Sequence, residues 1–232
     1  YDSNSIANWP ASPIDGATPG RANSVARDAP RPIVEAIRLR ASAPDPNDPL
    51  IRKDDSVIAA VRFSHGPVLG AALEFFLDDI ARTDEPRAAI VLADDGLMPD
   101  EAANDLVWTG TLDPRPDRTI VRYRVLADLG EGEQGVSPRE SDPYGWHAYF
   151  VSPAISTATP VYEIFIAPVN WGRMWTNITG GRVSGCNASA TWDAEVPAVF
   201  AHEGRVYDVF VRYQGSRWGR TGGPDIAVWP YP

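Results

Sequence analysis

The sequence is short of several residue types, and each shortage excludes a class of structure or chemistry. Its 232 residues include one cysteine, Cys186, which excludes an intramolecular disulfide and a zinc site built on CxxC pairs. The three histidines, His65, His147 and His202, form no HxH or HxxxH pair, which argues against a histidine zinc site. No apolar run reaches the length of about 18 residues that a membrane-spanning helix needs.

Positive charge is also scarce. Lys53 is the only lysine, and the formal net charge is -10. Residues 30–152 carry 22 acidic and 13 basic side chains, whereas residues 153–232 carry six of each. Nucleic acids and anionic lipid surfaces reward clustered Lys and Arg, so neither is expected as the main partner, and we expect no membrane insertion.

The composition and hydrophobic pattern of the chain change twice, which predicts three segments. Residues 1–30 are rich in Pro, Gly, Ser, Asn and Ala without periodicity, as in a linker or the end of another domain. Residues 31–153 contain short apolar runs of period two, typical of an antiparallel β-sandwich. Residues 154–232 begin a second unit. The predicted fold is therefore mainly β.

Seven strands are predicted in the sandwich. They are residues 33–40, 55–64, 70–79, 88–95, 104–112, 118–128 and 145–151. In the segment 118–128, the alternation places Val121, Tyr123, Val125 and Ala127 inside and leaves Arg122, Arg124 and Asp128 in water. Slipping this register by one residue would bury unpaired arginines. The same reasoning turns Leu73, Phe75 and Leu77 inward.

The loop between the fourth and fifth predicted strands is acidic. Its carboxylates are Asp94, Asp95, Asp100, Glu101 and Asp105. Carboxylate oxygens are the ligands that Ca²⁺ prefers, although this spacing fits no EF-hand loop. The alternative is an ordinary solvated loop, and both interpretations stay open.

The second unit predicts a strand at 161–167, a short helix starting at Pro168, and a hairpin over 195–215 that turns at Glu203 and Gly204. Three strands and one helix are few for an independent core, so further structure is expected on the C-terminal side. Tryptophans also cluster here and predict an interface. They are Trp171, Trp175, Trp192, Trp218 and Trp229. The interface would face a protein partner, a sugar, or the remainder of the fold.

Two segments resemble known bacterial domains. The segment "NWPASPIDGATPGRANS" resembles the closing stretch of a lamin-tail domain, through Trp9, a TPG turn at 18–20 and Asn23. The middle segment resembles a fibronectin type III-like or Ig-like module, through "YRVLAD" and the later "GW-Y-V" strand.

The final segment resembles the opening of the spore-coat protein H (CotH) kinase-like domain over about 60 residues. The matching positions are Pro160, Tyr162, Glu163, Asn170, Trp171, Val196, Pro197, Phe200, Gly204, Tyr207, Asp208, Val211, Arg212 and Gly215. The resemblance implies a secreted or surface-attached bacterial protein. Phosphoryl transfer by such a domain would need a lysine, two further aspartates and ATP with Mg²⁺. Residues 153–232 contain no lysine and three aspartates. No catalytic residue is therefore assigned, and the resemblance implies that the catalytic part lies outside this chain.

The loop after the predicted hairpin is a candidate phosphate-binding site, because it combines glycine with several arginines. Its candidate residues are Arg212, Gly215, Ser216, Arg217 and Arg220. The alternative is a surface turn in which Arg212 pairs with a carboxylate. For the whole chain we expect a structural or interaction segment that binds copies of itself or other proteins. Part of a kinase and a carbohydrate-binding module are the alternatives.

Overall fold

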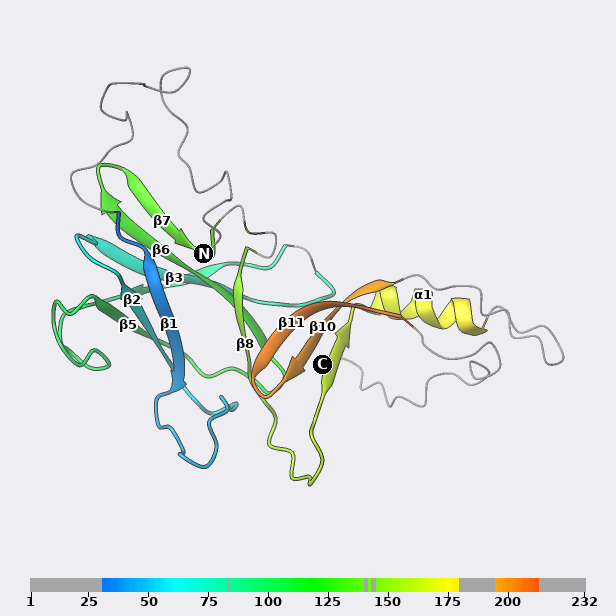
Figure 1. The fold of residues 1–232 in the computed structure, drawn as a ribbon. Helices are drawn as coiled ribbons and strands as arrows, with labels where there is room; N and C mark the ends of the chain where they lie inside the picture. Colours follow the sequence, from blue (N-terminus) through cyan, green and yellow to red (C-terminus); the bar gives the residue numbers. More distant parts are fainter. Residues whose placement is uncertain (1–30, 83, 140–141, 143–144, 180–194, 213–232) are drawn as a thin grey trace, which may run out of the picture.

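A computed structural model describes residues 31–82, 84–139, 142, 145–179 and 195–212. It shows a mainly β molecule in which antiparallel sheets form a sandwich and a smaller sheet lies against one end of it (Figure 1). One sandwich sheet has the order β1-β2-β5, with β1 at Val34–Ala41, β2 at Val57–Phe63 and β5 at Val107–Leu112.

The second sandwich sheet has five strands. They are β3 (Gly70–Leu77), β4 (Ala88–Leu92), β6 (Ile120–Gly130), β7 (Glu133–Ser137) and β8 (His147–Phe150). Strands β4, β3, β6 and β7 follow one another, and β8 pairs with β6. Buried residues of both sheets, such as Val61 and Leu73, form one hydrophobic core. All seven strands predicted for this segment are confirmed, and β7 is an addition to them.

The predicted register of β6 is confirmed, since Val121, Tyr123, Val125 and Ala127 are all buried. The prediction that the arginines between them lie in water is wrong. The side chain of Arg122 is only 11% exposed because Asp78 and Asp208 pair with it, and Arg124 is partly covered by Glu74 and Trp146. The paired carboxylates offset the desolvation cost of burying these charged side chains.

One inward position of β3 is also wrong. Leu73 and Phe75 are buried as predicted, but Leu77 is 40% exposed. Leu77 is the last residue of β3 and does not belong to the core cluster.

The second unit contains β9 (Glu163–Ile166), α1 (Pro168–Thr179), β10 (Val196–His202) and β11 (Arg205–Val211). Its antiparallel sheet has the order β11-β10-β9. The helix starts at the predicted proline, and the hairpin turns where expected, with positive φ at Glu203 and Gly204.

One face of this small sheet packs against the sandwich. A second hydrophobic cluster joins Ile120 of β6 and Phe150 of β8 to Phe165 of β9 and to Val199 and Ala201 of β10. The rings of Phe150 and Phe165 meet edge to face with centroids 5.7 Å apart. The sandwich thus supplies part of the core that the short second unit needs.

Candidate functional site

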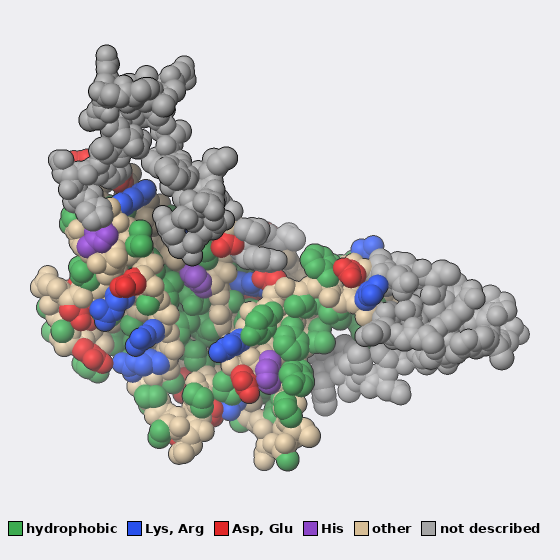
Figure 2. Space-filling view, in the orientation of Figure 1, with side chains coloured by type: hydrophobic (Ala, Val, Ile, Leu, Met, Phe, Trp, Pro, Cys, Tyr) green, Lys and Arg blue, Asp and Glu red, His purple; other side chains and the backbone are tan. Residues whose placement is uncertain are grey.

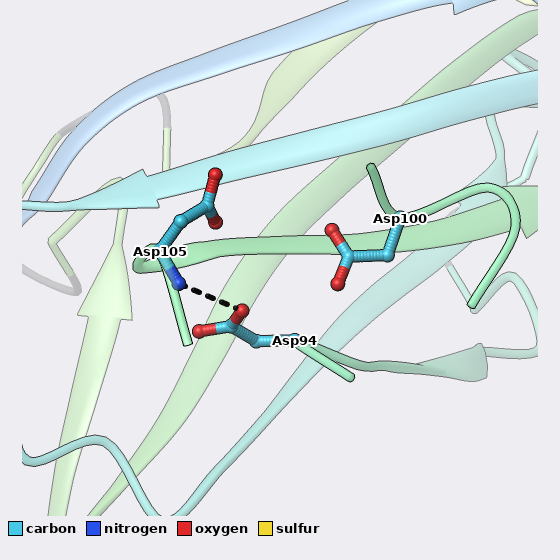
Figure 3. A group of neighbouring side chains, drawn as sticks. All are labelled: Asp94, Asp100 and Asp105. Atoms are coloured by element: carbon cyan, nitrogen blue, oxygen red, sulfur yellow. Dashed lines mark hydrogen bonds between the residues drawn. The ribbon is translucent and has the colours of Figure 1, made fainter. Parts of the chain in front are cut away.

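The acidic loop between β4 and β5 brings three of its five predicted calcium residues together. Ligand oxygens of Asp94, Asp100 and Asp105 all lie within 4.8 Å of one another. Their carboxylates point toward a common centre (Figure 3). Asp95 and Glu101 lie outside this group, and the Glu101 side chain is largely exposed, 3.9 Å from an Arg40 nitrogen.

These carboxylates also organise the loop backbone. The two oxygens of Asp94 accept hydrogen bonds from the backbone N–H groups of Asp105 and Leu106, each at 3.1 Å. Asp100 is 4% exposed, and its Oδ2 accepts a 2.7 Å hydrogen bond from the N–H of Gly96. Turn stabilisation by side-chain oxygens accounts for these positions without an ion, so calcium binding stays a prediction.

The predicted phosphate loop lies mostly outside the described residues. Arg212 is exposed, and it forms no ion pair with another described residue. Gly215, Ser216, Arg217 and Arg220 fall outside the described ranges, so phosphate binding stays a prediction.

Most of the predicted tryptophan interface also lies outside the described residues, so it stays a prediction. Trp171 lies half-buried in α1, where its backbone N–H donates to the backbone carbonyl of Ala167 at 2.9 Å. The side chain of Trp175 and the residues Trp192, Trp218 and Trp229 lie outside the described part of the structure.

A different aromatic surface is present on the small sheet. The side chains of Tyr162, Ile164, Phe200, His202 and Tyr207 form what we call the aromatic face. Ile164 and Tyr207 lie directly opposite Phe200 on the neighbouring strands, so the three side chains share one side of the sheet. This is the side opposite to the one that packs on the sandwich.

The rings of the aromatic face contact one another but are not covered. Tyr162 stacks on Phe200 with centroids 5.8 Å apart and lies 4.5 Å from the ring of His202. Tyr207 lies 6.0 Å from Phe200 on the other side. Tyr162, Ile164 and Tyr207 remain 59%, 55% and 45% exposed. Hydrophobic side chains gather over the β10–β11 hairpin in Figure 2.

Sequence reasoning missed this surface for a specific reason. Strand β10 carries apolar residues on both sides, because Val199 and Ala201 alternate with Ala198 and Phe200. Alternation alone therefore does not show which side the sandwich covers. The signal that was available is the aromatic pair Phe200 and Tyr207, placed symmetrically about the predicted hairpin turn.

Comparisons with known proteins add no family assignment. No protein-family model matches the chain, and no curated protein matches it either. Within the described residues, the structure contains no helix of the length and apolar character required to cross a membrane.

Proposed function

We propose that this chain is a structural or interaction segment that assembles with copies of itself or with protein partners. The aromatic face carries the proposal, since it places exposed apolar and aromatic side chains side by side on a sheet. Contiguous exposed apolar surface of this kind is typical of protein contact sites, in which Tyr is enriched.

The edge of the same sheet supports the proposal. Strand β11 has a strand partner, β10, on one side only among the described strands. It also exposes Phe210, which is 69% exposed and lies on the side of the strand opposite to Tyr207. An edge strand offers unpaired backbone N–H and C=O groups to which another strand can add.

The proposal also includes the kind of protein to which this segment belongs. The resemblances to lamin-tail, fibronectin type III-like and spore-coat protein H kinase-like domains support a secreted or surface-attached bacterial protein. In that protein the sandwich would act as a spacer, and the small sheet would begin a larger domain with its catalytic part elsewhere.

Sedimentation velocity over a range of concentrations tests assembly through the aromatic face. The variant Ile164→Lys places a charge in the face at a position that is already exposed. The matched control is Val91→Lys, because Val91 is an 83% exposed apolar residue of β4 in the sandwich. We expect concentration-dependent association that Ile164→Lys weakens and Val91→Lys preserves. A monomer at all concentrations, or equal effects of both variants, would contradict self-assembly through this face.

Carbohydrate binding is a second candidate that the exposed rings of Tyr162 and Tyr207 favour, since aromatic faces stack on sugar rings. Titration against a glycan panel, followed by tryptophan and tyrosine fluorescence, tests it. Saturable binding that Tyr207→Ala abolishes would support this candidate, and a flat response to every glycan would reject it.

A further inference from the structure

A cavity of about 210 Å³ lies where the sandwich meets the small sheet. Leu50, Phe150 and Ser152 line it from the sandwich, and Glu163, Ala201 and His202 line it from β9 and β10. At about 30 Å³ for each water molecule in the liquid, it has room for roughly seven waters or for one small organic molecule.

The carboxylate of Glu163 is the least satisfied charged group at this cavity. Its Oε1 lies 3.2 Å from Nε of Arg118. Its Oε2 is shielded from solvent and has no hydrogen-bond partner in the described part of the chain. A buried acceptor without a partner is costly, so a ligand donor that reaches the Glu163 carboxylate from the cavity would be stabilised.

The second polar wall of the cavity is His202, whose ring is held by a hydrogen bond to the backbone. Nδ1 lies 2.9 Å from the carbonyl oxygen of Val161. A carbonyl only accepts hydrogen bonds, so Nδ1 donates to it. Nε2 lies 3.7 Å from the exposed carboxylate of Glu203.

Most of the donors around the cavity are already engaged. Arg52 bonds Asp48 and the carbonyl oxygens of Ser152 and Pro153. The hydroxyls of Thr157 and Thr159 lie 3.0 Å apart, and one of them donates to the other. The cavity therefore offers mainly acceptors, the carboxylates of Glu163 and Glu203, beside an apolar wall of Leu50, Phe150, Ile155, Val161 and Ala201.

We propose that this junction cavity binds a small primary ammonium compound, with the ammonium group on Glu163 and a short hydrocarbon chain against the apolar wall. An ammonium group has three donors and no acceptor, which matches the free groups of the cavity. Its hydrogen bonds to a carboxylate are charge-assisted and stronger than those of a neutral hydroxyl. An anion would meet the carboxylates of Glu163 and Glu203.

Three probes with four carbon atoms each test the chemistry by nuclear magnetic resonance titration: n-butylammonium, n-butanol and butyrate. Saturable shifts of the Glu163 and His202 amide signals are expected with n-butylammonium, and much weaker shifts with the other two. Equal binding of n-butanol would show a merely apolar cavity. No binding of n-butylammonium, or preferred binding of butyrate, would overturn the proposal.

Two variants locate the site. Glu163→Gln keeps the side-chain size and is expected to weaken n-butylammonium binding about tenfold or more, as expected for losing a charge-assisted contact. Glu203→Gln, at the exposed rim, is the control and is expected to change the affinity less than about twofold. An unchanged affinity in Glu163→Gln would refute the role of this carboxylate.

A third variant covers the case in which Glu163→Gln does not fold. Thr157→Trp changes an exposed linker residue that lines the cavity, and the larger ring would fill the space without replacing a core residue. Loss of n-butylammonium binding in the folded Thr157→Trp protein is expected. Retained binding would place the ammonium site elsewhere and overturn the proposal. His202 belongs to both sites, but Glu163 lies on the side of the sheet opposite to Phe200 and Tyr207. Thr157 is not part of the aromatic face, so the Glu163 and Thr157 variants test the cavity independently of the proposed assembly function.

Discussion

Arg122 of β6 and Asp208 of β11 form a two-point ion pair that fastens the small sheet to the sandwich. Nη1 donates to Oδ2 at 2.8 Å and Nη2 donates to Oδ1, while Nε donates to Asp78 at 2.7 Å. Burial alone would lower the pKa of Arg122, but the hydrogen bonds to Asp208 and Asp78 outweigh it and raise the pKa above its usual value. The guanidinium stays charged and bridges the two units.

Asp208→Asn is expected to weaken this junction by about 1 to 3 kcal/mol, because it removes a charge-assisted partner from a buried guanidinium. Hydrogen exchange should accelerate at the amides of β10 and β11 and remain slow in the core of β6. Asp84→Asn is the control, since the Arg82–Asp84 pair is exposed and 3.7 Å long. Equal exchange changes in both variants would mean that the Arg122–Asp208 pair does not fasten the sheet.

Leu73→Ala is expected to lower the free energy of unfolding by about 3 kcal/mol, because it leaves a cavity between the sandwich sheets. Leu73 is fully buried in the main core. Urea unfolding followed by circular dichroism measures the loss. Val91→Ala, at an exposed position of β4, should change the free energy by less than about 0.5 kcal/mol. A small loss in Leu73→Ala would contradict a single core shared by both sheets.

The strands of the sandwich were predictable because alternation reports burial directly. Val57, Val61 and Val125 sit at period-two positions, and all are buried. Strand β7 was not predictable in this way. Its sequence EQGVS has no apolar alternation, and it joins the sheet through backbone pairing with β6.

Contacts between residues that are far apart in the sequence could not be predicted from alternation. Alternation places Arg122 on the outer side of β6, but Asp208, which covers it, lies 86 positions away in the chain. The acidic loop shows the same limit. Its composition suggested a shared carboxylate site, whereas the path of the loop decides that Asp94, Asp100 and Asp105 converge and Glu101 does not.

Asp100→Ala is expected to cost about 1 to 3 kcal/mol of stability in the presence of EDTA, because a buried hydrogen bond to the N–H of Gly96 is lost. Thermal unfolding with EDTA and with added Ca²⁺ separates the two interpretations of the loop. A loss that is the same in both conditions supports a purely structural role. A rise in unfolding temperature with Ca²⁺ that Asp100→Ala removes would instead establish the calcium site.

Stability is expected to fall as pH rises through the folded-state pKa of Glu163. Burial raises the pKa of this carboxyl, and Arg118 opposes the rise only in part. The folded state therefore holds the proton to a higher pH than the unfolded state does. The contribution of Glu163 to the stability of the fold is fully present below the pKa that its carboxyl has in the unfolded state. This contribution is lost above the pKa that the carboxyl has in the folded state.

Urea unfolding of the parent chain and of Glu163→Gln between pH 4 and pH 7 measures this dependence. The difference in unfolding free energy, parent minus variant, should decrease with increasing pH, because only the parent must bury an ionised Oε2. Glu203→Gln, at an exposed carboxylate on the same hairpin, is the control and should leave the pH profile of the parent unchanged. If the difference increases with pH, then Arg118 outweighs burial, and Oε2 is not the unsatisfied acceptor that the junction geometry indicates.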